Sequence, residues 1–425
     1  MSLLTFCTAS PSLSLTQGRD KGHKWRKIKE MVEKSGVSSS VCYPVDSLKK
    51  GNWVKLICGA SFEDVADIRN LSLVYTLAGV DCIDCAADAS IVNAVNEGIS
   101  VAKDIVSLRS PWIMISVNDD VDLHFRKAEF DPSECPPNCS RPCEKVCPAD
   151  AITLQRVTSD EGLPLEIASS SKLEGGVIRG RCYGCGRCFP VCPYDKIRSN
   201  TYVRCPTATA ELLKRNNVDA IEIHTSAREI NSFEKLWNSL ADFVGHLNLV
   251  ADVIQVSLPD LGESTVDAMN KMYTIMNPFL KCYNLWQLDG RPMSGDIGRG
   301  ATRDAIAFAA RMSSIKDKPH GFLQLAGGTN FHTVGGLKEA GLFQTPNIQE
   351  DGNDVHQAER FSGWPYASIG GVAYGGYARK IVGRVLNKMQ SEEGPAHIER
   401  YPDYLVEALE EALSLVGPVK CYTLS

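Results

Sequence analysis

The sequence lacks two features that would place it at a membrane or on a nucleic acid. No uninterrupted apolar run among its 425 residues is long enough to cross a bilayer, so no membrane span is predicted. It also lacks a basic surplus, with 45 Lys and Arg against 51 Asp and Glu. The excess of acidic residues lies in residues 51–425, which contain 36 basic and 47 acidic residues. We therefore expect no nucleic-acid partner. Its composition, 44% hydrophobic, is ordinary for a large globular core.

The N-terminus lacks acidic residues altogether over residues 1–18 and is rich in Ser, Thr and Leu. Basic residues then follow closely between Arg19 and Lys29. This composition resembles an organelle transit peptide, most like a plastid one, and predicts an unstructured extension over residues 1–45 and a chloroplast-stroma location. The alternative is the basic tail of a cytoplasmic protein.

Short apolar runs alternate with helical periodicity from about residue 50 onward. The predicted strands are residues 53–58, 81–85, 112–117, 220–224, 253–258, 284–289, 321–326 and 367–372. Eight strand–helix units predict an α/β fold, a (β/α)8-like barrel, with an open doubly wound sheet as the alternative. The barrel is expected in two parts, residues 46–117 and residues 206–425, the second ending in a C-terminal helix. Residues 118–205 form an insert after strand 3, where a loop reaches the barrel mouth.

Eight of the nine cysteines in the insert lie in two runs, each of which ends in Cys-Pro. The first run is Cys135, Cys139, Cys143 and Cys147, and the second is Cys182, Cys185, Cys188 and Cys192. The second run has the C-x2-C-x2-C-x3-C-P spacing of bacterial ferredoxins, in which the fourth cysteine ligates the other cluster. The first run has wider gaps. We predict a 2[4Fe–4S] ferredoxin module. In it, Cys192 completes the cluster held by the first three cysteines of the first run, and Cys147 completes the cluster held by the first three cysteines of the second run.

Other roles for these cysteines are less favoured. A pair of zinc sites remains the main alternative, although zinc motifs usually come as two separated C-x2-C pairs. A disulfide framework is not expected in so long a chain. Neither run has the C-x3-C-x2-C spacing of a radical-SAM enzyme. Cys58, Cys82 and Cys85 are predicted to be buried free thiols, with a redox role kept open by their place near strand ends.

Glycines follow the last two predicted strands, where barrels commonly hold phosphate. The candidate cofactor-binding residues are Gly327, Gly328, Thr329, Asn330, Gly370, Gly371, Gly375, Gly376 and Arg379, with Lys380 as a second cation. The alternative is that these glycines only form tight turns. Strand six is followed by a polar loop that contains Asp289, Arg291, Ser294, Asp296 and Arg299. His224 is a candidate base, with a hydrogen-bonded structural histidine as the alternative, and no catalytic residue is assigned.

Several segments together resemble the light-dependent-period A (LdpA) family of cyanobacteria and plastid lineages. They are residues 51–61, residues 124–132, both cysteine runs and residues 326–330. The resemblance covers nearly everything from about residue 46. It implies an iron–sulfur protein that senses cellular redox state and modulates circadian period, with the eight cysteines of the insert as cluster ligands.

Two functions follow as expectations. The first is electron transfer or redox sensing and regulation, with a redox or regulatory protein as partner. The second is a barrel oxidoreductase in which the clusters pass electrons to a flavin or other phosphate-bearing ligand at the barrel mouth. A scaffold in which the clusters only hold the insert together is a third. Whether the protein is an enzyme stays open.

Overall fold

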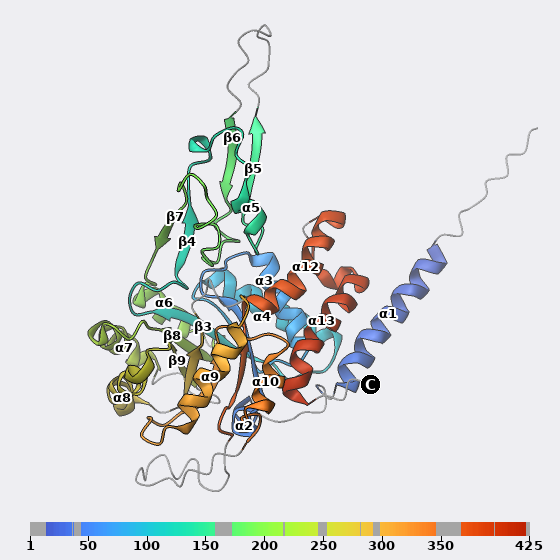
Figure 1. Cartoon of the computed structure of the whole chain (residues 1–425). Coiled ribbons are helices and arrows are strands. Elements are labelled where there is room, and N and C mark those ends of the chain that lie inside the picture. The colour runs from blue at the N-terminus through green and yellow to red at the C-terminus, as the bar shows by residue number, and fades with distance from the viewer. Residues whose placement is uncertain are drawn as a thin grey trace, which may run out of the picture.

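Eight parallel strands close into a barrel in the computed structural model of the chain (Figure 1). The structure describes residues 14–35, 37, 44–157, 172–215, 217–244, 253–280, 282–291, 298–345, 367–394 and 396–421. The barrel strands are β1 (Trp53–Gly59), β2 (Cys82–Ala86), β3 (Trp112–Asn118), β8 (Ala220–His224), β9 (Val253–Pro259), β10 (Tyr283–Asp289), β11 (Phe322–Ala326) and β12 (Gly371–Tyr374). The sheet closes where β1 pairs with both β2 and β12. The (β/α)8 prediction is confirmed.

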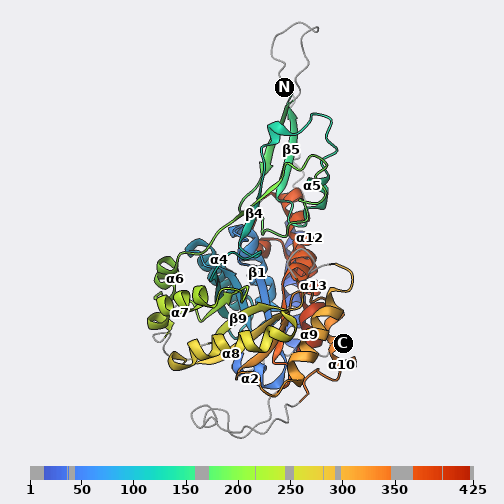
Figure 2. The same ribbon diagram turned by 60° about the vertical axis from the view of Figure 1, so that its left-hand side comes forward.

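Helices cover the outside of the barrel (Figure 2). They are α3 (Val65–Leu77), α4 (Ala89–Ile105), α6 (Pro206–Leu213), α7 (Ile230–Val244), α8 (Thr265–Met276), α9 (Ala301–Ser314), α10 (Thr333–Glu339), α12 (Gly376–Glu393) and α13 (Pro402–Lys420). The short helix α2 (Pro44–Lys50) lies instead at the lower end of the barrel in Figure 1. Aspartates begin two of them, since Asp64 and Asp88 accept hydrogen bonds from first-turn backbone N–H groups of α3 and α4. Among the helices in the described part of the chain, none has the length and hydrophobicity needed to cross a bilayer.

The barrel interior changes from apolar to polar along its axis. An apolar cluster that includes Trp53, Trp112 and Phe322 fills the end where the strands begin. Two residues further along the strands, the inward side chains are polar and include the buried Lys55, Gln287 and Gln324. Because side chains alternate between faces of a strand, this polar layer lies between the apolar end and the mouth.

The insert leaves the barrel after β3 and is built on two antiparallel hairpins. They pair β4 (Arg126–Glu129) with β7 (Arg198–Thr201), and β5 (Ile152–Val157) with β6 (Lys172–Val177). The insert also contains the short helices η2 (Pro132–Glu134) and α5 (Pro142–Val146). Its own small core contains apolar residues such as Ala151 and Ile197, and seven of the eight run cysteines belong to it or pack against it. Figures 1 and 2 show the insert standing above the mouth end of the barrel.

Polar contacts join the insert to the barrel. Glu63, on the loop after β1, accepts hydrogen bonds from Lys127 and Arg204, both at 2.9 Å. Arg181 reaches Asp64 at 3.1 Å and Gln390 of α12 at 3.1 Å. The insert is therefore held over the mouth by the first strand–helix loop and by the last helix of the barrel.

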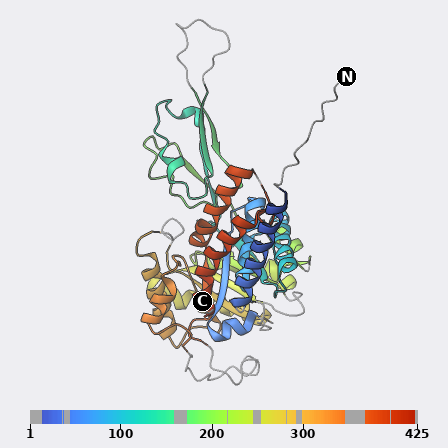
Figure 3. The same cartoon turned by 90° about the vertical axis from the view of Figure 1, so that its right-hand side faces the viewer.

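The N-terminal segment contains a packed helix, which corrects the prediction of an unstructured extension over residues 1–45. Helix α1 (Ser14–Lys34) lies beside α13 (Figure 3). Ile28 and Val32 are fully buried, and Lys27 forms a 2.8 Å ion pair with Glu410. The basic residues that suggested a solvated tail alternate with apolar ones, so a helix buries one face and leaves the other charged. Residues 1–13 lie outside the described residues.

Candidate metal centre and barrel mouth

The eight cysteines of the two runs form two groups of four, and Cys205 belongs to neither. The first quartet is Cys135, Cys139, Cys143 and Cys192, and the second quartet is Cys147, Cys182, Cys185 and Cys188. Burial raises the pKa of Cys135, and so do its neighbours Cys139 and Cys192. Burial likewise raises the pKa of Cys188 to about 12, with further contributions from Cys185, Cys182 and Cys147. Each run thus places its fourth cysteine beside the first three of the other run.

The second quartet lines one pocket together with Ala149, Ala151 and Tyr183. Backbone N–H groups point at the sulfurs: Ala151 donates to Cys147 Sγ at 3.2 Å and Ala128 to Cys182 Sγ at 3.3 Å. In the first quartet, Lys196 N–H donates to Cys192 Sγ at 3.4 Å. Four converging thiols with amides aimed at their sulfurs fit an iron–sulfur cluster. Burial alone opposes ionisation of these thiols, but bound iron would favour the thiolate form.

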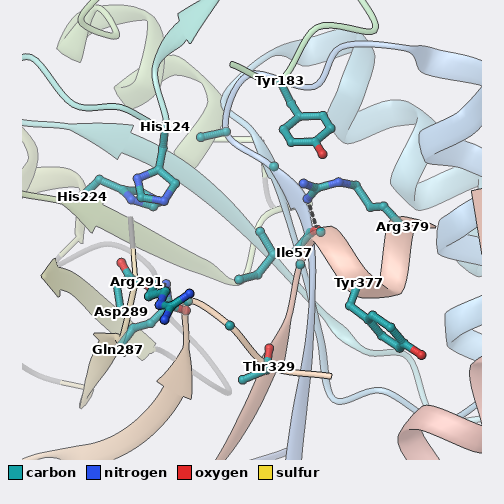
Figure 4. Close-up of a pocket in the computed structure, with 16 residues that line it drawn as sticks. Ile57, His124, Tyr183, His224, Gln287, Asp289, Arg291, Thr329, Tyr377 and Arg379 are labelled. Atoms are coloured by element: carbon teal, nitrogen blue, oxygen red, sulfur yellow. Dashed lines mark hydrogen bonds between the residues drawn. The ribbon is translucent and has the colours of Figure 1, made fainter. Parts of the chain in front are cut away.

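The barrel mouth contains a pocket of about 640 Å³ (Figure 4). Of the residues predicted there, Gly327, Gly328 and Thr329 after β11 line it, as do Gly375, Gly376 and Arg379 after β12. Its other wall comes from β8, β10 and the insert, and includes His124, Tyr183, His224, Gln287, Asp289 and Arg291. The pocket therefore brings together the glycine loops, the loop after strand six and the proposed base, as well as two insert residues that the sequence did not indicate.

Three predicted glycine-loop residues lie elsewhere. Gly370 and Gly371 come at the start of β12, at the closed end of the barrel, so their assignment to the mouth is wrong. A Cβ on Gly371 would lie 2.2 Å from the carbonyl oxygen of Trp53, so this glycine allows close strand packing. Asn330 forms the turn before α10, where its Oδ1 accepts from His332 N–H at 2.9 Å. Ser294 and Asp296 fall outside the described residues, and Lys380 is exposed.

Arg379 joins α12, β1 and the insert. Its Nη1 donates to the carbonyl oxygens of Ile57 and Cys58 at 2.7 and 3.0 Å. Its guanidinium lies 4.3 Å from the ring centroid of Tyr183, a distance typical of a cation–π contact. Tyr183 also lines the pocket of the second quartet. The Tyr183 side chain therefore lies between the cysteines of that quartet and the mouth pocket.

Two histidines at the mouth have opposite protonation tendencies. Their ring centroids are 4.7 Å apart. Burial would lower the pKa of His124, but Asp122, 2.7 Å from its Nδ1, raises it to about 9. Burial lowers the pKa of His224 to about 4 despite nearby Glu222. The ligand atoms of these two histidines and Asp122 lie within 4.8 Å of one another. A protonated imidazole has no free lone pair for a metal ion, and His124 is already hydrogen-bonded to Asp122. We therefore describe His124 and Asp122 as a hydrogen-bonded pair rather than as part of a metal site.

A buried polar network below the pocket is the feature that sequence reasoning missed. Lys55 Nζ lies 2.7 Å from Glu222 Oε2, and both side chains are fully buried. Gln287 Nε2 donates to Glu222 Oε1 at 2.8 Å and Gln324 Nε2 donates to Gln287 Oε1 at 2.8 Å. The sequence did contain a signal for this network, namely polar residues at alternate positions of otherwise apolar strands. Such residues are unusual in parallel strands, because both faces of these strands are buried.

The predicted free thiols outside the insert are confirmed as free and buried: Cys58, Cys82 and Cys85. Burial raises the pKa of Cys58 to about 12, so its thiol is protonated and poorly nucleophilic. Burial likewise raises the pKa of Cys82 and Cys85, so all three thiols are held in the protonated form.

Comparison with known proteins identifies the family. Residues 135–203 match the LdpA Fe-S cluster-binding domain, and residues 212–418 match the light dependent period A C-terminal domain. The protein named "Light dependent period A" from Synechococcus elongatus is 38% identical over 381 residues, which cover 90% of this chain and 95% of that protein.

Solved structures are more distant. A pyruvate kinase of Cryptosporidium parvum matches with 10% identity and a TM-score of 0.30 over 68% of each chain. The same enzyme in complex with ADP gives 9% identity and a TM-score of 0.28 over 68% of this chain and 67% of that chain. Such scores carry no argument about function. The sequence matches and the cysteine-bearing insert together show that this chain is an iron–sulfur protein of the light dependent period A family.

Proposed function

We propose that the protein binds two [4Fe–4S] clusters, one in each quartet, and acts in electron transfer or redox sensing. One observation carries the proposal: the two cysteine runs exchange their fourth members in space. Such an exchange is the arrangement of two-cluster ferredoxins, and independent zinc sites do not require it. Each cluster, when bound, would accept or release one electron.

The chain's own residues would set the properties of these clusters. Backbone N–H groups that point at cysteine sulfurs stabilise negative charge and so favour the reduced state. Three of the four cysteines in the first quartet are partly exposed, whereas two of the four in the second quartet, Cys182 and Cys188, are buried. We infer that the first quartet faces a redox or regulatory protein partner and that the second faces the barrel.

Anaerobic reconstitution tests the proposal. We expect about eight irons and eight acid-labile sulfides per chain, because each [4Fe–4S] cluster carries four of each. Reduction with dithionite should give a paramagnetic resonance signal from interacting clusters. Stoichiometric zinc in natively isolated, colourless protein would contradict it.

We also propose a role in redox input to a regulatory system, in the chloroplast stroma. The name of the S. elongatus relative refers to a light-dependent period, which supports regulation. The acid-free, serine-rich residues 1–18 support import. A fusion of residues 1–40 to a fluorescent reporter should enter plastids; a reporter that stays in the cytosol would contradict the location without affecting the cluster proposal.

A second candidate is a barrel oxidoreductase, and one contact supports it. Tyr183 lines both the second-quartet cavity and the mouth pocket, so a ligand in the pocket would lie one side chain from that quartet. Anaerobic purification followed by mass analysis of released small molecules distinguishes the two candidates. A stoichiometric flavin or other redox-active ligand favours the oxidoreductase, and reversible cluster redox chemistry without one favours the carrier or sensor.

A further inference from the structure

The glycine side of the mouth pocket has the features of an anion site. Gly375 and Gly376 begin α12, which has 18 residues, and no side chain in the described part of the chain caps its first turn. The first N–H groups of a helix lack intrahelical partners, and the helix dipole favours negative charge there. A Cβ on Gly375 would meet nothing closer than 3.6 Å, so at this position the glycine leaves space open toward the pocket.

Two arginines, Arg379 and Arg291, add positive charge to the pocket lining. Arg379 uses Nη1 for two carbonyl oxygens, but its buried Nε meets no acceptor among the described residues. Arg291 also lines the pocket, with its Nε bonded to Asp304 at 2.5 Å. A buried donor without an acceptor is costly, and an anion in the pocket would provide one.

The opposite wall is a second and independent indication of a ligand. His224 is only 5% exposed and lines the pocket, and its Nδ1 has no hydrogen-bond partner in the described part of the chain. Gln287, 1% exposed, and Asp289 lie beside it. Buried polar groups that converge on one pocket are typical of a small-molecule site.

We propose that the barrel mouth binds a small phosphate monoester. Its phosphate lies on the backbone amides after β11 and β12, beside Arg379, and its polar opposite end reaches His224 and Asp289. Loops after the last two strands are where barrels of this kind place phosphate groups. The site uses barrel residues apart from contact with Tyr183 and His124, so it does not depend on which metal the insert holds.

Equilibrium dialysis with radiolabelled orthophosphate, at constant ionic strength and with the full chain, tests the site. Gly375→Asp places a carboxylate where the phosphate lies. Gly375 has φ −111° and ψ −105°, which is not the extended backbone of a usual N-cap, so circular dichroism and thermal unfolding of the variant are measured before its binding is compared. We expect this variant to bind phosphate at least about tenfold more weakly, because its carboxylate would repel the bound anion. Gly383→Asp adds the same charge two turns further along α12, where a Cβ meets nothing within 4 Å, and should bind like the parent protein.

Competition decides between free phosphate and a monoester. FMN and adenosine 5′-monophosphate are two monoesters of different shape, and riboflavin and adenosine are their phosphate-free forms. We expect at least one monoester to displace labelled phosphate at a lower concentration than orthophosphate does, and its phosphate-free form not to displace it.

Several results would overturn the proposal. One is that the parent protein binds no phosphate. A second is that Gly375→Asp and Gly383→Asp bind phosphate equally, or that both variants fold but neither binds it. A third is that neither monoester displaces labelled phosphate at a lower concentration than orthophosphate does. If Gly375→Asp does not fold, Tyr377→Glu brings a carboxylate to the same pocket and serves in its place, and undiminished binding by that variant overturns the site.

Discussion

Arg126 Nε donates a hydrogen bond of 2.6 Å to the carbonyl oxygen of Gly184, within the loop of the second quartet. The guanidinium also lies 5.3 Å from the ring centroid of Phe189 and is 8% exposed. Gly184 has a φ of +75°, and a Cβ there would lie 2.2 Å from the Arg126 carbonyl oxygen, so the glycine permits this approach. A fixed positive charge is therefore buried beside the cysteines of the second quartet.

Removing that charge should make the second cluster harder to reduce. We expect Arg126→Met to lower its reduction potential by about 60 mV, the equivalent of about 1.4 kcal/mol for one electron, because a nearby cation stabilises the added negative charge. Potentiometric titration followed by paramagnetic resonance measures it. Arg126→Lys, which keeps the charge but loses the planar guanidinium, should stay close to the parent value. Equal potentials in the Met variant and the parent would show that the charge has no such effect.

The exchanged cysteines predict which double variants lose one cluster and which lose two. Cys139→Ser with Cys192→Ser removes two ligands of the first quartet, so iron should fall by about half, as in either single variant. Cys185→Ser with Cys192→Ser removes one ligand from each quartet and should deplete both clusters. Iron and sulfide analysis after reconstitution checks this. If the two double variants were reversed in iron content, each run would hold its own cluster.

The Lys55–Glu222 ion pair predicts a stability pattern inside the barrel. Lys55→Met should lower the free energy of unfolding by about 3–5 kcal/mol, because the Glu222 carboxylate would stay buried without its cation. Lys55→Met with Glu222→Gln should recover most of that loss, since the charge is removed as well. Urea unfolding of both variants and the parent measures the difference. A double variant no more stable than Lys55→Met would mean that packing, not charge, sets the cost.

His124 predicts a stability change on the alkaline side. Its folded-state pKa is about 9, above the ordinary value of 6.5, so protonation favours the folded state. The stabilisation is complete below about pH 6.5 and is lost as pH rises through about 9. His124 is a quarter exposed, so we expect about 1–2 kcal/mol, reduced by solvent screening.

The measurement is the urea unfolding free energy between pH 6 and pH 10. His124→Gln should remove this part of the pH dependence, while His23, on α1 and remote from the mouth, provides the control substitution His23→Gln. Parallel pH curves for the parent and His124→Gln would contradict the assigned pKa.

Most barrel strands were predictable because their apolar runs are short, β-branched and bounded by turn residues, as in residues 112–117. Strand eight was placed at residues 367–372, whereas β12 spans Gly371–Tyr374. Its glycine-rich start has no side-chain periodicity to mark the boundary. Helix α1 was missed because its apolar residues are sparse, and only contact with α13 makes burying them favourable.

The order of residues alone determined the ligand chemistry of the insert and the repeated strand–helix units, because cysteine spacing and hydrophobic period are local properties. The same spacing already predicted that Cys147 and Cys192 each join the other run. Only the tertiary structure decided that Tyr183 lies between the second quartet and the mouth. It also decided that Lys55 and Glu222, 167 positions apart, share one buried ion pair. Such contacts depend on how the barrel closes, and closure is a long-range result of packing that no short stretch of sequence encodes.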